Sequence, residues 1–471
     1  MRVAAIDQGT TSTRCLVVED GGAWHVAASV RHGQHHPSPG WVEHDAEELL
    51  ANVKAVLQAA GRVDGIAIAN QGESCLAWDG ETGKPLSPVI VWQDARTGDA
   101  LAALDRSAVQ RSKEVSGLPL DPYFSASKLA WLLKNIPSVA EAHGRGRLRL
   151  GTTDAFFLDR LTGTFATDLA TASRTGLLDL STGGWSKEMC ALHGVPMECL
   201  PQIRPVDAGF GAVDGVPVKV SIVDQQAALH GHGCRKAGDC KITFGTGAFL
   251  LAVSGSDRPP ASDLLPTVAW QREGERPVFA IEGGVYDAGS AVEWAGRLGL
   301  FTDPTELSAF EGPSALSRGI VFVPALSGLA APYWDRQAAP LFIGMDHATD
   351  KRDLARAVLE GIAMMTASLV EAASSVTPLG ASISIDGGLS QSDYFAAFLA
   401  AASNRTIRVP QMHELTALGL AELCGIHVEA ARAAATIFAP DGSVGAQEHA
   451  RYAEAVARTR GWRQGHPASS S

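Results

Sequence analysis

A strand–turn–strand pattern that occurs twice is the feature that most constrains the fold of this chain. In residues 3–20 (VAAIDQGTTSTRCLVVED) two apolar runs flank a glycine-containing turn. The same order recurs in residues 241–255 (KITFGTGAFLLAVSG). Apolar runs joined by such turns predict β-hairpins. Two hairpins with the same strand–turn–strand order predict that the chain contains an internal duplication.

Other segments predict helices between these strands. In residues 382–404 an apolar strand, SISID, runs through GGLS into a segment with helical spacing. Residues 46–60 place their leucines and valines on one helical face, and residues 349–365 form a second helix, opened by a Thr349 or Asp350 cap. Alternating strands and helices around two hairpins predict a bilobal α/β protein.

Length and composition support two large domains. The chain has 471 residues, 46% of them apolar and 19% charged, which is enough to bury sizeable cores. We place the N-terminal domain at 1–233 and the C-terminal domain at 234–471, with the seam between 224 and 240 and a disordered tail at 465–471.

Charge and cysteine usage exclude several classes of function. The net charge of −12 and the absence of a basic block argue against binding nucleic acid. No run approaches the ~18 apolar residues that a membrane span requires, and the first residues do not form a secretory signal. The seven cysteines are odd in number, scattered and never in a CxxC pair, so we expect reduced thiols in the cytoplasm. Histidines at 32–36 and 230–234 lack the spacing of a zinc site.

The glycine turns have a chemical meaning as well. Glycine lets backbone N–H groups converge on an anion, and neighbouring Thr and Ser hydroxyls add donors. A polyphosphate fits between two such turns. No GxxxxGK[ST] motif occurs, and no GxGxxG follows the first strand, which argues against a P-loop and a dinucleotide fold.

Several longer motifs in this order resemble the FGGY family of carbohydrate kinases, and within it the glycerol kinase-like branch. The motifs are DQGTTSTR (7–14), PGWVEHDAEELL (39–50), DPYFSASKLAWLL (121–133), DQQAAL (224–229), TFGTGAFLL (243–251), APYWDRQAAPLFIGM (331–345) and DGGLSQSDYF (386–395). The resemblance implies two ribonuclease-H-like domains of the actin and hexokinase superfamily, with ATP and Mg²⁺ in the cleft between them. It also implies transfer of the γ-phosphoryl group to a hydroxyl of a polyol or sugar, by a homo-oligomer (dimer or tetramer).

The resemblance assigns Asp224 as the catalytic base. A hydroxyl is a poor nucleophile near neutral pH, and a positioned carboxylate that accepts its proton lowers the barrier. Gln225 then holds a substrate hydroxyl beside it. The alternative is that Asp224 only caps a helix that begins at Gln225.

Further residues match the family's phosphate, metal and nucleotide positions. Asp7 helps to hold Mg²⁺ through water, with turn stabilisation as its alternative role. Arg14 stabilises charge on the transferred group. The remaining phosphate and nucleotide positions are Thr10, Thr11, Gly245, Thr246, Gly247, Gly289 and Gly388.

The acceptor side matches the glycerol kinase pattern with one departure. Glu73, Trp92, Tyr123, Asp224 and Gln225 occupy substrate positions, the two aromatic residues as walls for a carbon chain or, alternatively, as core packing. At Gly72 the pattern carries an arginine. Losing a charged donor of about 1.5 to 3 kcal/mol weakens glycerol binding by roughly ten- to a hundredfold unless another donor compensates. We therefore expect Gly72 to make room for an acceptor larger than glycerol.

Three alternatives accompany this interpretation. The chain is a true glycerol kinase, a sugar-sensing ATP-binding protein without catalysis, or an actin-like or chaperone-like ATPase. All of Asp7, Thr10, Arg14 and Asp224 are present, which argues against lost chemistry. No appended peptide-binding domain occurs, which argues against a chaperone.

Overall fold

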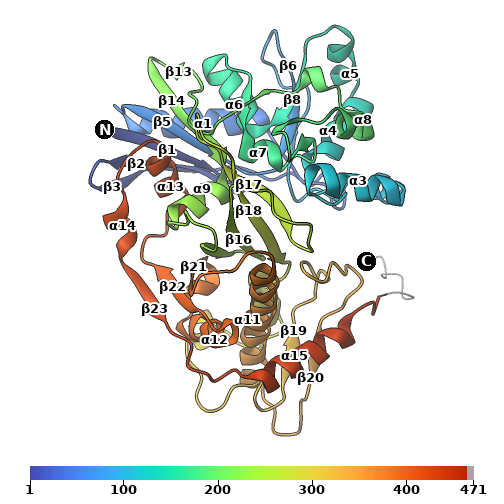
Figure 1. Cartoon of the computed structure of the whole chain (residues 1–471), viewed down its shortest axis with the longest axis vertical. Coiled ribbons are helices and arrows are strands. Elements are labelled where there is room, and N and C mark those ends of the chain that lie inside the picture. The colour runs from blue at the N-terminus through green and yellow to red at the C-terminus, as the bar shows by residue number, and fades with distance from the viewer. Residues whose placement is uncertain (464–471) are drawn as a thin grey trace.

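Both predicted hairpins form, and each lies within one large sheet (Figure 1). The computed structural model describes residues 1–463; the tail expected at 465–471 lies outside the described residues. Strand β1 (Arg2–Gln8) pairs antiparallel with β2 (Ser12–Glu19) and parallel with β5 (Gly65–Asn70). Strand β15 (Cys240–Phe244) pairs antiparallel with β16 (Ala248–Gly255) and parallel with β21 (Ser382–Gly387). The repeated pairing confirms the internal duplication and the two-domain α/β fold.

The two sheets define an N-terminal and a C-terminal lobe. The N-terminal sheet has the order β13-β14-β5-β1-β2-β3 and is completed by β13 (Ala212–Val213), β14 (Val216–Val223) and β3 (Trp24–Arg31). The C-terminal sheet has the order β17-β18-β16-β15-β21-β22-β23 and is completed by β17 (Leu265–Trp270), β18 (Val278–Val285), β22 (Thr406–Pro410) and β23 (Ala435–Phe438).

Helix α1 (Ala46–Ala60) has the bounds that the sequence predicts. The Asp45 carboxylate caps it by accepting the N–H groups of Glu47 and Glu48, and Gly61 ends it. Its leucine and valine face packs on the N-terminal sheet, with Leu49 and Val53 fully buried. The amphipathic pattern therefore predicts which face of the helix packs on the sheet.

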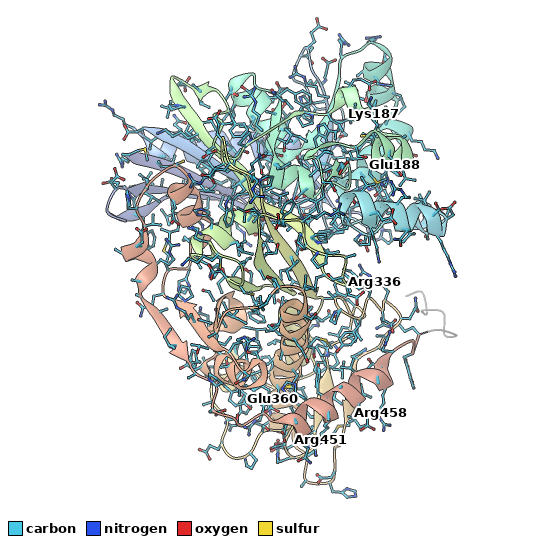
Figure 2. All side chains as sticks on the ribbon, in the orientation of Figure 1. Lys187, Glu188, Arg336, Glu360, Arg451 and Arg458 are labelled. Carbon is cyan, nitrogen blue, oxygen red and sulfur yellow. The ribbon has the colours of Figure 1, made fainter. Side chains whose placement is uncertain are left out.

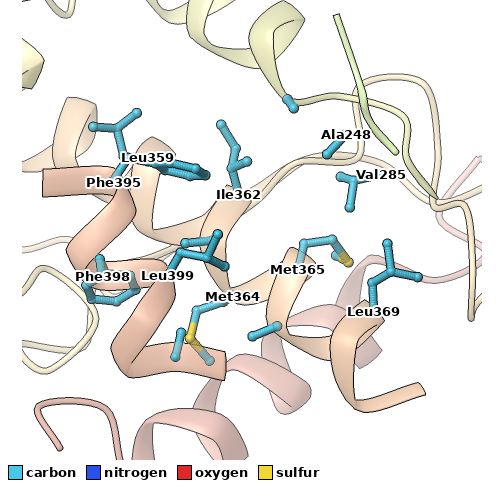
Figure 3. Packing of buried hydrophobic residues seen from close by; sticks show 14 of the residues in the cluster. Ala248, Val285, Leu359, Ile362, Met364, Met365, Leu369, Phe395, Phe398 and Leu399 are labelled. Carbon is cyan, nitrogen blue, oxygen red and sulfur yellow. The ribbon is translucent and has the colours of Figure 1, made fainter. Parts of the chain in front are cut away.

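Helix α11 (Lys351–Val376) begins at its predicted Asp350 cap but continues 11 residues beyond the predicted end at 365. Figure 3 shows its side chains between those of α12 (Asp393–Ser403) and the strand residues Ala248 and Val285. Contrary to the sequence expectation, α11 is long and apolar enough to span a membrane, yet 78% of its most apolar stretch is buried in the protein. It is the central core helix of the C-terminal lobe.

Two helices join the lobes. Helix α9 (Asp224–Gly231) follows β14, and α13 (Leu415–Leu423), although late in the sequence, packs against α9, β1 and β5 (Figure 1). Their backbones touch: a Cβ atom on Gly231 would lie 1.9 Å from the carbonyl oxygen of Leu415, and one on Gly419 would lie 1.9 Å from that of Ala227. Only glycine fits at either position.

The remaining elements cover the sheets and form smaller layers. In the N-terminal lobe these are β4 (Glu43–His44), β6 (Cys75–Asp79), β7 (Val89–Ile90), α2 (Gly98–Ala102), α3 (Arg106–Ser116), α4 (Ser125–Asn135), α5 (Pro137–Gly144), β8 (Leu148–Thr152), α6 (Thr153–Thr162), β9 (Ala166–Asp168), α7 (Leu169–Ser173), β10 (Leu178–Asp179), β11 (Gly184–Trp185), α8 (Lys187–His193), the 3₁₀ turn Met197–Cys199 and β12 (Gln202–Arg204). In the C-terminal lobe they are α10 (Gly289–Arg297), the 3₁₀ turns Pro304–Leu307 and Gly388–Gln391, β19 (Val321–Val323), β20 (Leu341–Ile343), α14 (Glu429–Ala433) and α15 (Ala446–Thr459).

Candidate active site

A cavity of about 110 Å³, here called the central pocket, lies between the two lobes. It brings together all six residues predicted for the acceptor side, from loops and helix starts far apart in the sequence. Its lining residues are Thr10, Gly72, Glu73, Trp92, Tyr123, Arg174, Val223, Asp224, Gln225, Gln226, Phe249 and Glu282. Phe249 on β16 and Glu282 on β18 are the contributions of the C-terminal sheet. Both lobes therefore contribute walls to one site.

Asp224 lies at the junction of β14 and α9, where the strand ends at Val223 and the helix begins. Its carboxylate accepts one hydrogen bond, from the backbone N–H of Gln225 at 2.6 Å, and lines the pocket. The pKa of this carboxyl is raised to about 7, mainly by burial and also by the negative charge of Asp7. A carboxylate that only caps a helix has no need to line a pocket, so its position supports the catalytic interpretation.

The side chain of Gln225 is oriented by a lysine that sequence reasoning did not identify. Lys241, on β15, is fully buried and donates to the side-chain oxygen of Gln225 and, at 2.8 Å, to Thr243. Because the amide oxygen of Gln225 accepts from Lys241, its NH₂ group remains for donation elsewhere. Gln225 lines the central pocket, so this NH₂ group is available to an oxygen bound beside Asp224.

Glu73 has an unusual backbone, with φ at +58°. Such a left-handed conformation costs of order 1–3 kcal/mol for a residue with a side chain, and it persists where surrounding contacts enforce it. Here the Ser125 hydroxyl donates to the Glu73 carbonyl at 2.9 Å. Arg174 Nε donates to the Glu73 carboxylate at 2.7 Å. The strained turn fixes a buried carboxylate in the pocket wall.

Arg174 follows α7 and was not identified from the sequence. Its side chain is 2% exposed and lies between two buried carboxylates, with Nη1 2.8 Å from Glu282 Oε2. Burial raises the pKa of Glu73 to about 7, and the positive charge of Arg174 opposes that rise. The pocket therefore contains a guanidinium group although position 72 has none. It is a candidate for the compensating donor that the sequence left open.

Gly72 does not leave the open space that we expected. A Cβ atom added at Gly72 would lie 2.9 Å from Cγ2 of Val223, the residue that precedes the catalytic candidate. The isopropyl group of Val223 fills the volume next to Gly72 and forms part of the pocket wall. The exchange of an arginine for glycine therefore makes this wall apolar, and any extra room for an acceptor lies elsewhere.

Trp92 and Tyr123 form an aromatic wall of the pocket. Their rings meet edge to face with centroids 5.6 Å apart. Trp92 Nε1 donates to Thr10 Oγ1 at 3.0 Å. Both residues are half-buried and line the cavity, so they do more than pack in a core. The hydrogen bond ties the acceptor side to the first glycine turn.

The first glycine turn places two charged groups on neighbouring strands. Asp7 on β1 is opposite Arg14 on β2 in the strand register. Arg14 forms an ion pair with Glu414, which immediately precedes α13. Burial raises the pKa of Asp7 to about 6, the charge of Glu414 adds to the rise, and Arg14 opposes it.

These carboxylates fit a magnesium ion. The negative charge of Glu414 contributes to the raised pKa of Asp7, and that of Asp7 contributes to the raised pKa of Asp224, so neighbouring carboxylates in this group lie close together. Hard oxygen ligands with excess negative charge are the ligand type that Mg²⁺ prefers. Among residues 1–463 no cluster of three or more His, Cys, Asp or Glu forms a self-contained metal cage. Asp7 is the residue that would hold such an ion, with Glu414 and Asp224 adding negative charge nearby.

The second glycine turn, Gly245 to Gly247, connects β15 and β16 and supports the start of α10. The N–H groups of Ala288 and Ser290 donate to Thr246, and that of Gly289 donates to Gly245, all at 3.0 Å. A Cβ atom on Gly289 would lie 2.5 Å from the Gly245 carbonyl oxygen, so packing between turn and helix requires this glycine.

Two other predicted glycines have open surroundings. A Cβ atom at Gly245 or at Gly388 would meet nothing within 4 Å. Their bare backbone therefore faces free space, as a ligand-binding glycine should. Thr11 and Thr246 are exposed at the tips of the two turns.

Fold and site together define a two-domain α/β protein with the Asp224 carboxylate in a pocket lined by both lobes. The chain belongs to the FGGY family of carbohydrate kinases: the N-terminal domain of that family matches residues 2–231, and its C-terminal domain matches residues 240–428.

The most similar relatives include glycerol kinases. The glycerol kinase of Geobacter sp. (strain M21) is 39% identical over 441 residues, which cover 90% of this chain and 89% of the relative. That of Thermus brockianus is 40% identical over 442 residues, with the same coverage.

Solved structures show the same fold. Plasmodium falciparum glycerol kinase with ADP superimposes with a TM-score of 0.88 at 29% identity, covering 97% of this chain and 98% of that one. Xylulose kinase from Rhodospirillum rubrum gives a TM-score of 0.84 at 23% identity, covering 97% and 98%, and this likeness concerns the fold alone.

Proposed function

We propose that this carbohydrate kinase transfers the γ-phosphoryl group of ATP to a hydroxyl of a small polyol or sugar, with Asp224 as the general base. The observation that carries the proposal is the central pocket itself, which has the Asp224 carboxylate and Gln225 on one part of its wall and the Glu73–Arg174 pair on another. A molecule with several hydroxyls can hydrogen-bond to both. Its carbon chain then lies against the rings of Trp92 and Tyr123.

In the proposed reaction each of these groups has one role. The acceptor hydroxyl oxygen forms a bond to the γ-phosphorus, the bond from that phosphorus to its bridging oxygen breaks, and ADP leaves. Asp224 accepts the hydroxyl proton, and Gln225 holds the oxygen through its NH₂ group. Arg14, released from Glu414, stabilises the negative charge of the transferred group. Asp7 would hold Mg²⁺, which would supply positive charge to neutralise the phosphates.

The acceptor that we favour is larger than glycerol. The wall formed by Gly72 and Val223 offers no hydrogen-bonding side chain where the glycerol kinase pattern has a guanidinium group. Glycerol itself is the second candidate, because Arg174 supplies a guanidinium group to the same pocket and the relatives from Geobacter sp. and Thermus brockianus are glycerol kinases.

A panel of acceptors decides between these two. We would measure kcat/KM by coupled ADP release with glycerol, erythritol, xylitol, ribitol, and C5 and C6 ketoses. We expect a four- or five-carbon acceptor to exceed glycerol. If glycerol has the highest kcat/KM, the larger-acceptor proposal is wrong. Sugar binding without turnover would instead support a sugar-sensing protein. ATP hydrolysis that does not depend on an acceptor would support an ATPase.

The pH dependence of the reaction tests the base separately. Asp224 must be ionised to accept a proton, and its pKa is raised to about 7. We therefore expect kcat/KM to fall as pH decreases through about 7, because the protonated carboxyl cannot act as a base. A profile that stays flat down to pH values near 4, where an ordinary aspartate titrates, would contradict the assignment.

Location and assembly complete the proposal. We propose a cytoplasmic enzyme on the basis of the unpaired cysteine pattern, and a homo-oligomer on the basis of the family resemblance. Mass measurement in solution tests the second point.

A further inference from the structure

A second cavity, of about 70 Å³, adjoins the central pocket, and we call it the annex. The two cavities share three lining residues, Tyr123, Phe249 and Glu282. The annex is completed by Pro119, Asp121, Phe124, Leu265, Gly283, Gly284, Val285, Tyr286, Ala330, Trp334 and Arg336. None of these was assigned a role in binding nucleotide, phosphate or metal.

The annex is lined mainly by carbon. Aromatic rings, proline, leucine, valine and alanine side chains form most of its wall. Its charged groups are paired: Glu282 with Arg174, and Arg336 with Asp121 at 3.4 Å, while the Arg336 guanidinium also lies 4.2 Å from the centre of the Tyr286 ring. Figure 2 labels Arg336 between the two lobes in this view. Extra hydroxyl groups would therefore find few free partners there.

The annex also opens outward. A groove of about 690 Å³ between α3 and the loop before β17 shares Pro119, Leu265 and Trp334 with it. Trp334 has φ at +48°, and its Nε1 donates to the Asp263 carbonyl at 2.6 Å. As with Glu73, a strained residue is held in place by a specific contact beside a cavity. The outer groove, the annex and the central pocket are therefore neighbours that share wall residues, with Asp224 lining the innermost of the three.

We propose that the annex binds a short hydrocarbon group at the end of the acceptor remote from the phosphorylated hydroxyl. The substrate class is then a compound with a glycerol-like or polyol head and an alkyl or alkoxy extension. The volume limits its length, since a cavity of roughly 150 Å³ holds a benzene molecule and the annex has about half of that. Three or four carbon atoms fit. This inference rests on the proposed function and names an apolar extension as the chemical class of the larger acceptor.

A homologous series of acceptors tests the inference. We would compare glycerol with 3-methoxy-, 3-ethoxy- and 3-propoxypropane-1,2-diol, and with erythritol and xylitol as hydroxylated compounds of similar length. Each buried methylene is expected to raise kcat/KM about fourfold. The rise should continue to the propoxy compound and stop with longer chains. Ethers that are no better than glycerol, or poorer than xylitol, would overturn the inference.

Matched variants test whether the gain in kcat/KM with alkyl acceptors arises in the annex. Ala330 lines the annex but not the central pocket, and it is 6% exposed. We expect Ala330→Leu to remove the gain with the propoxy compound and to change kcat/KM for glycerol less than twofold. Ala261→Leu makes the same change in the outer groove and should preserve the gain. If Ala330→Leu folds poorly, Ala330→Ser adds a hydroxyl with little volume and should reduce the gain.

The outcomes separate the two proposals. If no polyol, sugar or ether supports ADP release, the proposed function is wrong. If polyols are phosphorylated but the alkyl series shows no rise, or Ala330→Leu keeps the rise, the proposed function stands and the annex inference is wrong.

Discussion

Replacing Asp224 by alanine is expected to abolish phosphoryl transfer and leave nucleotide binding nearly intact. The carboxylate lines the central pocket beside Gln225 and is the base we assign to the acceptor proton. General base catalysis contributes roughly 10²- to 10⁴-fold, so kcat should fall by at least the lower of these factors. ADP release measures the loss, and calorimetric titration with ATP measures binding.

Two companion variants make that result specific. Asp224→Asn keeps the shape of the side chain and should be nearly as inactive as Asp224→Ala, because an amide cannot accept the proton. Asp257→Asn makes the same chemical change at a carboxylate that is 99% exposed, and it should behave as the unaltered enzyme. Near-normal turnover in Asp224→Asn would show that the base has been wrongly assigned.

Replacing Arg174 by methionine is expected to harm both stability and acceptor binding. The guanidinium group lies between Glu73 and Glu282, and all three side chains are buried. Removing one member of a buried charge group leaves its partners uncompensated, which costs about 3 to 5 kcal/mol. The loss of a charged donor should also raise KM for the acceptor about ten- to a hundredfold. Urea unfolding and steady-state kinetics measure these effects.

The controls for Arg174 separate charge from geometry. Arg174→Lys keeps the charge but cannot contact both carboxylates with one planar group, so it should recover stability better than KM. Arg276→Met removes an arginine that is 76% exposed and should change neither quantity. If Arg174→Met keeps a normal KM, the pocket does not use this guanidinium group for the acceptor.

The sequence predicts the fold well where the signals are local. The two hairpins and α1 combine apolar periodicity with glycine or a capping aspartate, and both kinds of signal act within a few residues. Helix α11 was predicted too short because its periodic apolar face becomes less regular after Met365. Its true end, at Val376, comes two residues before Pro378, which is a local signal that could have been used.

The sequence predicts site residues where they belong to a recognisable motif. DQQ identifies Asp224 and Gln225, and the central pocket contains both. Arg174 belongs to no motif that we used, and its partners lie 101 and 108 residues away in the sequence, so only the tertiary fold brings them together. One signal was present: Arg174 is a lone charge in the otherwise uncharged segment 169–178.

Gly72 shows that the residue at one position does not by itself predict free space in a pocket. Its missing side chain predicts space, but the space depends on Val223, which is distant in sequence and pairs with Asn70, two residues before Gly72. The identities of the two residues have to be read together.

The contact between α9 and α13 makes catalysis sensitive to positions that touch no substrate. Helix α9 is a short rigid rod, about 12 Å long, with Asp224 at one end and Gly231 at the other. A methyl group at Gly231 or Gly419 would force the two helices apart and tilt the rod. A displacement of about 1 Å at a reacting group can cost roughly a hundredfold in rate. The alignment of the proposed catalytic carboxylate is therefore set partly by the absence of side chains at Gly231, at the far end of its helix, and at Gly419 of α13.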